Sequence, residues 1–359
     1  MNIRRFGILA AATAVMLVLA IVATVRTTPP ARIIGDREPA FPKLVERIND
    51  VGAIEIKTRK HHFTIKGEGD QWGIVEKKNY RVPFAKVRDF VREAAELRLV
   101  EGKTRQKDRY GRLEVDEPEG EKSEARQFTV YAKNGEILAQ GYIGRRKYFL
   151  YADGRAGTYV RRGGDQQAWL AEGEVNLGRT APQWLDRLVF EFPVAEVRRY
   201  LITHPDGAKV AGQRNEPRGK VSLDNVPEGR RFRTDNEADR LALVVEKFEF
   251  EDIFPAPHIE WTGERHIAEY ETFDGVIITF EVKTFPKPEN ASVSAEPPRF
   301  GRVKASLAAD LPADKRAEAQ KRVDEINAKV KDWEYKLEEL DGLRTTKTME
   351  DMLEPERQS

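Results

Sequence analysis

The residues of this sequence that could do chemistry are closely spaced basic side chains beside an aromatic residue. They are Arg145, Arg146, Lys147, Arg161 and Arg162. Guanidinium and ammonium groups bind the phosphates of lipid headgroups and the charged groups of anionic polymers. The five residues, the first three next to Tyr148, therefore form a candidate surface for an anion or a partner. The same pattern also describes the solvent-exposed, arginine-rich end of a hairpin with no ligand.

Acidic residues and histidines predict no catalytic site. His61 and His62 are adjacent in a predicted strand, so their side chains leave opposite faces and are poorly placed to share a metal ion. Glu249 and Glu251 could serve acid–base catalysis or bind Ca²⁺, but they alternate with phenylalanines as on the solvated face of a strand. The spacings typical of zinc proteases, serine hydrolases and P-loop proteins are not found. We therefore predict no catalytic residue, no cofactor and no metal ligand.

Composition narrows the class of protein. The chain of 359 residues has no cysteine, which excludes disulfides, thiolate metal sites and a cysteine nucleophile. Its 61 Lys and Arg residues are balanced by 60 Asp and Glu residues, which gives a net charge of +1. Nucleic-acid-binding proteins usually carry a large basic excess, so we predict no nucleic-acid partner. At this length we expect one large domain or two medium-sized ones.

One segment differs from the rest in hydropathy. Residues 6–25 contain no charged side chain, and a helix of that length spans about 30 Å, the thickness of the hydrocarbon core of a bilayer. Arg4 and Arg5 precede it, which by the positive-inside rule places the N-terminus in the cytoplasm. We predict a single-pass protein of the inner (cytoplasmic) membrane that contacts the lipid bilayer through residues 6–25. The bulk of the chain is then periplasmic or otherwise extracytoplasmic.

Two other interpretations of this segment stay open. A cleaved signal peptide usually has an apolar region of about 7–15 residues and ends in an Ala-x-Ala site. Here the apolar run is longer, and Ala20 and Ala23 stand three residues apart. A buried helix of a soluble protein is the second alternative. With an anchor or a cleaved signal, the rest of the chain lies outside the cytoplasm.

The sequence predicts an α+β protein, with an N-terminal transmembrane helix followed by two repeated antiparallel-sheet-plus-helix units. Residues 1–26 are the signal anchor and 27–46 a proline-rich linker. Residues 47–195 form the first unit, and residues 196–359 form the second, with a charged C-terminal helix. The repeat is inferred from the order of the elements, because few residues match between the halves. Two unrelated halves are the alternative.

Local patterns place the elements of both units. Alternation of Ile54 and Ile56 with charged residues predicts a strand, and an apolar stripe after Pro83 predicts an amphipathic helix. We also expect a strand over residues 148–151, a short helix over 184–190 and a second amphipathic helix over 238–248. Near the C-terminus, apolar spacings of three and four between Val323 and Leu340 fit a heptad seam. The alternation of Trp333, Tyr335 and Leu337 instead predicts a closing strand, which we favour.

Several short motifs occur in a characteristic order: Gln71–Ile74, Val82-Pro83, Tyr110–Leu113, Gly157–Arg161, Trp184–Leu188 and Trp333–Leu337. In this order the chain resembles the bacterial domain-of-unknown-function family 4340 over most of residues 50–355. The family usually has Gly-Leu followed soon by Pro, where this chain has Gly111-Arg112-Leu113 and, later, Pro118. The resemblance implies an exported, membrane-anchored protein, often encoded beside ABC-type or gliding-motility transport components. It implies no catalytic residues.

We therefore expect a non-enzymatic, single-pass, membrane-anchored extracytoplasmic accessory protein. By resemblance, its partner is a membrane protein of an ABC-type transport or envelope complex. The alternative is an envelope binding module that captures an anionic polysaccharide or lipid through the basic residues between 145 and 162. An uncharacterised hydrolase is the third candidate.

Overall fold

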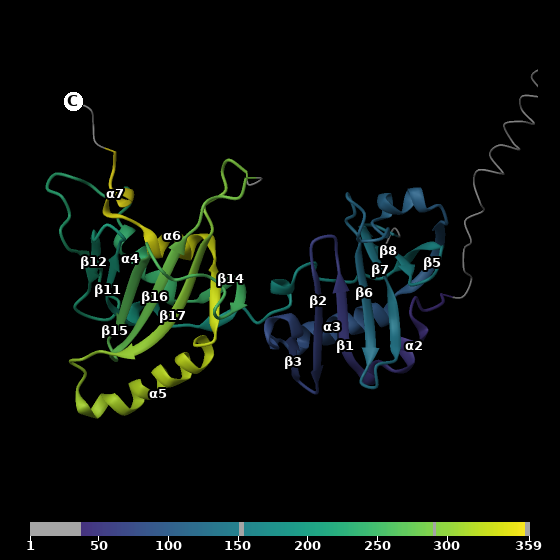
Figure 1. The fold of residues 1–359 in the computed structure, drawn as a ribbon, viewed down its shortest axis with the longest axis horizontal. Coiled ribbons are helices and arrows are strands. Elements are labelled where there is room, and N and C mark those ends of the chain that lie inside the picture. The colour runs from purple at the N-terminus through teal and green to yellow at the C-terminus, as the bar shows by residue number, and fades with distance from the viewer. Residues whose placement is uncertain (1–36, 151–153, 290–291, 356–359) are drawn as a thin grey trace, which may run out of the picture. The chain divides into compact units, whose positions relative to one another are not determined.

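The computed structural model describes residues 37–150, 154–289 and 292–355 (Figure 1). The predicted membrane segment, residues 6–25, lies outside the described residues. None of the helices that are described combines the length and the apolar character needed to cross a bilayer. The chain divides into two compact units between Trp184 and Leu185. Each unit contains one nine-stranded antiparallel sheet together with helices, so the predicted α+β class is confirmed.

The first unit has the strand order β4-β3-β2-β1-β6-β7-β8-β9-β5. Strands that neighbour each other in space are consecutive in the sequence, except at β1–β6 and β9–β5. The strands are β1 (Val51–Lys57), β2 (His62–Glu68), β3 (Gln71–Ile74), β4 (Tyr80–Val82), β5 (Arg98–Thr104), β6 (Arg126–Ala132), β7 (Ile137–Lys147), β8 (Gly157–Arg162) and β9 (Ala168–Glu172). The helices are α2 (Pro42–Glu46) and α3 (Phe84–Glu96), with 3-10 turns η1 (Ile48–Asp50), η2 (Val75–Lys77), η3 (Lys107–Leu113) and η4 (Ala181–Gln183).

Helix α3 packs on one face of this sheet. It follows Pro83 as predicted, and its buried stripe has the spacing of a helix with one apolar side: Val87, Phe90, Val91 and Ala94. The ring of Phe90 meets those of Phe128 and Trp184 edge-on, with centroids 5.5 and 5.7 Å away. Successive residues of a strand point to opposite faces, so the other face of the sheet carries the polar residues of β1 and β6.

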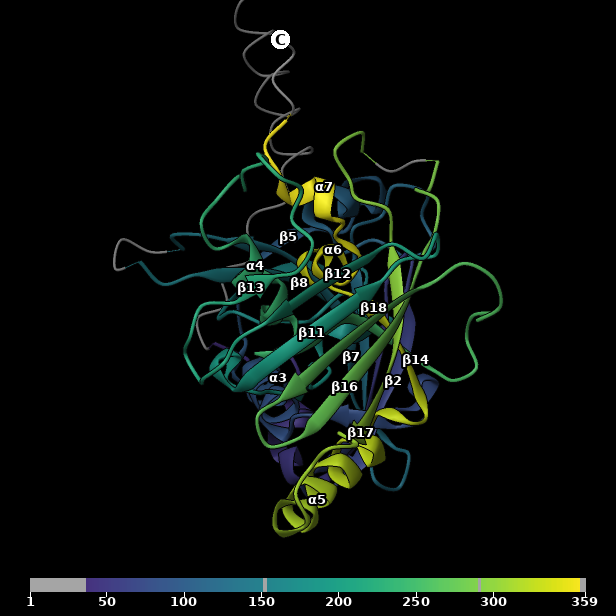
Figure 2. The ribbon, with the colours of Figure 1, turned by 90° about the vertical axis from the view of Figure 1, so that its left-hand side faces the viewer.

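The second unit has the strand order β10-β14-β18-β17-β16-β15-β11-β12-β13 (Figure 2). The strands are β10 (Leu188–Phe190), β11 (Val197–Thr203), β12 (Lys209–Gln213), β13 (Ser222–Leu223), β14 (Phe248–Pro255), β15 (His266–Thr272), β16 (Val276–Thr284), β17 (Arg299–Leu307) and β18 (Trp333–Leu337). The helical segments are η5 (Val194–Glu196), α4 (Glu237–Leu241), η6 (Ala242–Val245), α5 (Ala313–Val330), α6 (Glu339–Thr346) and α7 (Met349–Met352). Helix α6 packs with α4 and η6 and contacts β15, β16 and β17.

Eight strands follow the same order in both sheets. The series β3-β2-β1-β6-β7-β8-β9-β5 corresponds, strand for strand, to β13-β12-β11-β15-β16-β17-β18-β14. A bulge interrupts β1 between Val51 and Ala53 opposite β6, and β11 is interrupted in the same way between Val197 and Arg199 opposite β15. The corresponding hairpins β6–β7 and β15–β16 turn through Gly135 and Gly275. Both glycines have positive φ, a conformation that favours glycine. The sheets differ at their edges, where β4 is added to the first and β10 to the second.

Three predicted elements differ from the structure. Residues 188–190 form strand β10 instead of a helix, because Val189 and Phe190 bury their side chains when the strand pairs with β14. The predicted helix over 238–248 is short, consisting of α4 and η6, and Phe248 already belongs to β14. Strand β7 ends at Lys147, so Tyr148 and Phe149 lie beyond the sheet. In each case the local pattern was compatible with both structures, and pairing with a distant strand decided between them.

The predicted closing strand is confirmed. Helix α5 ends at Val330, and β18 begins at Trp333 and pairs with β14 and β17. The β17–β18 pairing extends over only two residues, Phe300 and Gly301. Farther along β17, α5 packs beside the strand and buries Val323 and Ile326 (Figure 1). A helix therefore covers the part of β17 that β18 leaves unpaired.

Asn327 joins α5 to this open edge. Its side-chain Oδ1 accepts a hydrogen bond from Ala305 N at 2.8 Å, and its Nδ2 donates one to Ala305 O at 2.9 Å, as a neighbouring strand would. Replacing Asn327 with alanine leaves both backbone groups unpaired and is expected to cost about 2 kcal/mol in the free energy of unfolding. Urea unfolding of the full-length chain in detergent micelles measures it. Gln320→Ala, on the exposed side of the same helix, is the control; equal losses for the two variants would contradict the role of Asn327.

Candidate functional site

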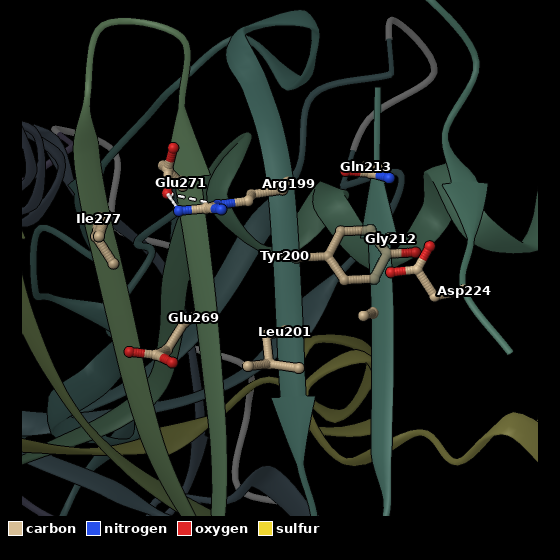
Figure 3. Close-up of a pocket in the computed structure, with 10 residues that line it drawn as sticks. Arg199, Tyr200, Leu201, Gly212, Gln213, Asp224, Glu269, Glu271 and Ile277 are labelled. Carbon is tan, nitrogen blue, oxygen red and sulfur yellow. Dashed lines mark hydrogen bonds and ion pairs between the residues drawn. The ribbon is translucent and has the colours of Figure 1, made fainter. Parts of the chain in front are cut away.

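A depression of about 410 Å³, lined by both charged and apolar residues, lies on the sheet of the second unit (Figure 3). Strands β11, β12, β15 and β16 contribute its lining, because alternate residues of each strand face the same side. The charged residues on this floor are Arg199 from β11 with Glu269 and Glu271 from β15. Asp224 lies at the β13 side of the depression (Figure 3).

The most buried charged group of this depression, the Glu271 carboxylate, forms ion pairs. Glu271 is only 4% exposed, and its Oε2 lies 2.5 Å from Arg199 Nη2. Arg198 Nη1 lies 3.2 Å from the other carboxylate oxygen, Oε1. Both oxygens of the Glu271 carboxylate are therefore already engaged by guanidinium groups of neighbouring residues.

The corresponding strands of the first sheet carry a smaller depression of about 150 Å³. Here Glu55 of β1 accepts a hydrogen bond from the hydroxyl of Tyr131, on β6, at 2.7 Å, and its other oxygen lies 2.7 Å from His62 Nε2, on β2. The hydrogen bond from Tyr131, followed by contributions from His62, holds the pKa of Glu55 below its usual value. Within the described residues, no group of three or more acidic or histidine side chains is placed to hold a metal ion.

A third depression, of about 470 Å³, separates α3 from the segment 176–184. Phe90 and Trp184 contribute aromatic surface to it, and Arg126 lies beside them. The Arg126 guanidinium donates hydrogen bonds to the carbonyls of Ile143, Gly144 and Leu177, at 3.2, 2.6 and 3.4 Å. Burial lowers its pKa. These bonds tie the segment to β7, so we assign Arg126 a structural role.

The structure does not bring the five basic residues together. Arg145, Arg146 and Lys147 end strand β7, and Arg145 and Arg146 pair with Glu114 and Glu174. Arg162 lies on β8 and fastens the N-terminal segment: its guanidinium binds the Glu38 carboxylate and donates hydrogen bonds to the carbonyls of Pro39 and Ala40. Anion binding by the exposed members stays a prediction.

Arg161 lies in the interior of the first unit, only 5% exposed. Its guanidinium is 3.9 Å from the centroid of the Tyr142 ring and 4.7 Å from that of Tyr110. Its Nε and Nη1 donate hydrogen bonds to the carbonyls of Val115 and Asp165. Its Nη2 binds the carboxylate of the exposed residue Glu117 at 2.8 Å, so a side chain of the protein itself already neutralises this cation. The contact also joins two of the sequence motifs, since Tyr110 begins one and Arg161 ends the other.

Sequence reasoning missed two groups of residues. The aromatic run at Tyr148 and Phe149 predicts a strand, whereas the structure ends β7 at Lys147 and leaves both side chains exposed. His204 and His266 are 62 residues apart, and their contact has no local signature. Their Nδ1 atoms lie 3.0 Å apart, and the rings meet edge-on. Burial lowers the pKa of His204, and burial together with nearby positive groups lowers the pKa of His266 to about 4.

Acidification is expected to destabilise the second unit through His266. Between pH 6.5 and about 4 the unfolded chain binds a proton at this residue and the folded chain does not, so stability falls as the pH falls through that window. Above pH 6.5 His266 is neutral in both the folded and the unfolded chain, and no stability is lost through it. Relative to His266→Gln, the wild type should lose about 2 kcal/mol between pH 7 and pH 5, at about 1.4 kcal/mol per unit. Urea unfolding of both proteins at pH 7 and pH 5 measures this loss. If the free energies of unfolding of the wild type and His266→Gln differed by the same amount at both pH values, the role of His266 would be contradicted.

The pH dependence of stability expected from Asp341 has the opposite sign to that from His266. It is buried on α6, and burial raises its pKa to about 6 despite an ion pair with Arg344 at 2.8 Å. Between pH 6 and 3.8 the folded chain binds the extra proton, so this residue adds stability as the pH falls. Asp341→Asn is expected to raise the free energy of unfolding at pH 7 by about 1–2 kcal/mol, and by less near pH 4. Thermal unfolding checks this against Asp310→Asn, an exposed control; no gain at pH 7 would refute it.

Comparison with known proteins gives one match. A family model described as Domain of unknown function (DUF4340) matches residues 72–262, more than half of the chain. The matched range begins in β3 and ends in the loop after β14, so it includes α3, the buried Arg161 and part of the second sheet. No curated protein and no solved structure matches the chain.

Proposed function

The chain belongs to the family Domain of unknown function (DUF4340), and from that membership we propose that it is a membrane-anchored extracytoplasmic accessory protein that catalyses no reaction. Its partner in this proposal is a membrane protein of an ABC-type transport or envelope complex. The partner class rests on the resemblance described above.

The uncharged segment at residues 6–25 carries this proposal. It is long enough to cross a bilayer, and Arg4 and Arg5 before it favour a cytoplasmic N-terminus. The protein is then a single-pass protein of the inner membrane, with residues 37–355 on the outer side. An anchor confines both units to the membrane plane and so raises their effective concentration near a membrane partner.

We also propose that the two units arose by duplication, with repeats over residues 47–195 and 196–359. The shared order of eight strands supports this, and so does the bulge at the same place in β1 and β11. Lys133 N donates to Asp50 O beside the first bulge, and Phe273 N donates to Glu196 O beside the second, both at 2.9 Å. Bulges are specific local features, which makes a matched pair a stronger argument than strand count.

The polar depressions of the two sheets support a binding role over catalysis. Their most buried charge, Glu271, is paired with two arginines, and the Glu55 carboxylate is bound by its two neighbours. The alternative function is an envelope binding module for an anionic polysaccharide or lipid. The exposed basic residues at the end of β7 favour this alternative.

Purification from detergent-solubilised membranes tests the proposal. The tagged full-length chain is expected to bring down a membrane-protein partner, whereas a variant with residues 1–26 replaced by a cleavable signal peptide should recover less of it. Capture by isolated envelope polymer alone, with no protein partner, would favour the alternative function. A reporter active only in the periplasm, fused after residue 359, checks the topology; an inactive reporter contradicts export.

A further inference from the structure

Two exposed aromatic side chains, Tyr148 and Phe149, directly follow β7 in the segment that leads to β8, and we call this pair the tip. Tyr148 and Phe149, which follow the last residue of β7, are 66% and 77% exposed. Phenylalanine and tyrosine usually bury most of their surface, so two adjacent exposed rings at a tip mark a contact surface.

The tip is held in a defined conformation. Phe149 has φ +58°, a left-handed backbone that a bulky residue rarely adopts, and such outliers concentrate at functional positions. Leu150 N, directly after Phe149, donates to Arg155 O at 2.7 Å and so ties this segment to the returning side of the hairpin. The Arg146 guanidinium lies 4.7 Å from the centroid of the Tyr148 ring. These local contacts therefore hold the two exposed rings in place.

The tip lies near the point where the described chain begins. Glu172 binds the guanidinium of Arg37, the first described residue, at 2.7 Å, and it also binds Arg155 of the hairpin. Lys147 pairs with Gly157, and Gly157 pairs with Glu172, so two strand spacings, about 10 Å, separate Lys147 from Glu172. Between Arg37 and the predicted anchor stand residues 26–36, which span at most about 40 Å when extended. The tip is thus within reach of the membrane.

The hairpin base has a local excess of positive charge. Among the described residues, four cations of the base pair with three carboxylates, Arg37 and Arg155 with Glu172, Arg145 with Glu114, and Arg146 with Glu174, and Lys147 adds a fifth cation. The whole chain, in contrast, has a net charge of +1. Anionic headgroups attract such a base, and aromatic rings favour the boundary between headgroups and acyl chains.

We propose that the Tyr148–Phe149 tip inserts into the interface of the bilayer that holds the N-terminal segment, with the basic hairpin base against anionic lipid headgroups. This rests on the membrane anchorage proposed above. A second attachment point gives the first unit a fixed orientation on the membrane, which a flexible linker alone does not provide.

Site-directed spin labelling of the full-length chain tests the insertion. Because the sequence has no cysteine, one introduced cysteine takes the label specifically. The test variant is Phe149→Cys. The matched control is Ile137→Cys, an exposed apolar position, 43% exposed, at the opposite end of the same strand. A third variant, Leu17→Cys, reports on the predicted anchor. All three are reconstituted in vesicles of phosphatidylethanolamine with phosphatidylglycerol.

For each spin label, the rate of collision with oxygen, which concentrates in bilayers, is compared with the rate of collision with a water-soluble nickel chelate. The labels at 149 and 17 are expected to favour oxygen, and the label at 137 the chelate. Omitting phosphatidylglycerol should weaken the oxygen preference at 149; no change overturns the headgroup contact. A label at 149 that favours the chelate while the label at 17 favours oxygen overturns the insertion and leaves the anchorage standing. A label at 17 that favours the chelate overturns both.

Discussion

Arg161→Ala is expected to destabilise the first unit by about 3–4 kcal/mol, one of the two largest effects that we predict. The substitution removes a planar cation from between Tyr110 and Tyr142 and leaves a cavity between the rings. It also leaves the carbonyls of Val115 and Asp165 without their donor. Thermal and urea unfolding of the full-length chain in detergent micelles measure the loss.

Two further variants show which property of Arg161 matters. Arg161→Lys keeps the charge but loses the planar fork that donates to both carbonyls, so we expect an intermediate loss of about 2 kcal/mol. Arg145→Ala is the matched control, because Arg145 is exposed and its pairing with Glu114 is worth at most about 0.5 kcal/mol. If Arg161→Ala were no more costly than Arg145→Ala, the buried contact would have no measurable role.

Glu334→Ala is expected to cost about 3 kcal/mol in the second unit. Glu334, on β18, is only 3% exposed, and its carboxylate organises the loop that follows β14. One oxygen accepts hydrogen bonds from the backbone N–H groups of His258 and Ile259, at 3.0 and 2.8 Å. The other accepts one from the Trp261 indole at 2.7 Å. Removing the carboxylate leaves three partly buried donors without their acceptor, and it also removes a buried side chain from β18.

The loop itself provides a second measurement. The Arg302 guanidinium lies 4.9 Å from the centroid of the Trp261 ring. Release of the loop should therefore shift the fluorescence of Trp261 toward that of a solvated indole. Glu251→Ala is the control, because Glu251 forms an exposed ion pair with Lys336 of β18 and should change stability by about 0.5 kcal/mol or less. Equal unfolding midpoints for Glu334→Ala and Glu251→Ala would argue against this role.

The candidate site could be predicted only in part. The cluster of cations between 145 and 162 is visible in the sequence, but neighbours in the sequence differ in their surroundings. Arg161 and Arg162 stand on opposite faces of β8, one between two tyrosines and the other against residues 38–40. The exposed tip was missed because Tyr148 and Phe149 have the composition of a strand, and only the end of β7 at Lys147 places them outside the sheet.

Much of the fold followed from local patterns. Alternation in β1 and β18 and the apolar stripe of α3 each predicted the correct element, because burial of one face selects residues at a fixed period. Short elements were less certain. Phe248 continued the apparent stripe of a helix, yet it begins β14, where its ring lies 5.4 Å from that of Tyr335 of the adjacent strand β18. A few apolar residues fit either period, so the distant partner decides.

By itself, the sequence determined the α+β class and the types of elements such as β1, α3 and β18, whose burial pattern was clear. These properties depend on local periodicity and composition. Only the tertiary structure decided which polar groups are buried and which are exposed. Arg161, Glu334 and His266 are each placed by partners far along the chain: Tyr110, Trp261 and His204. The environment of a charge depends on what packs around it, and strand pairing, which joins distant segments, sets that packing.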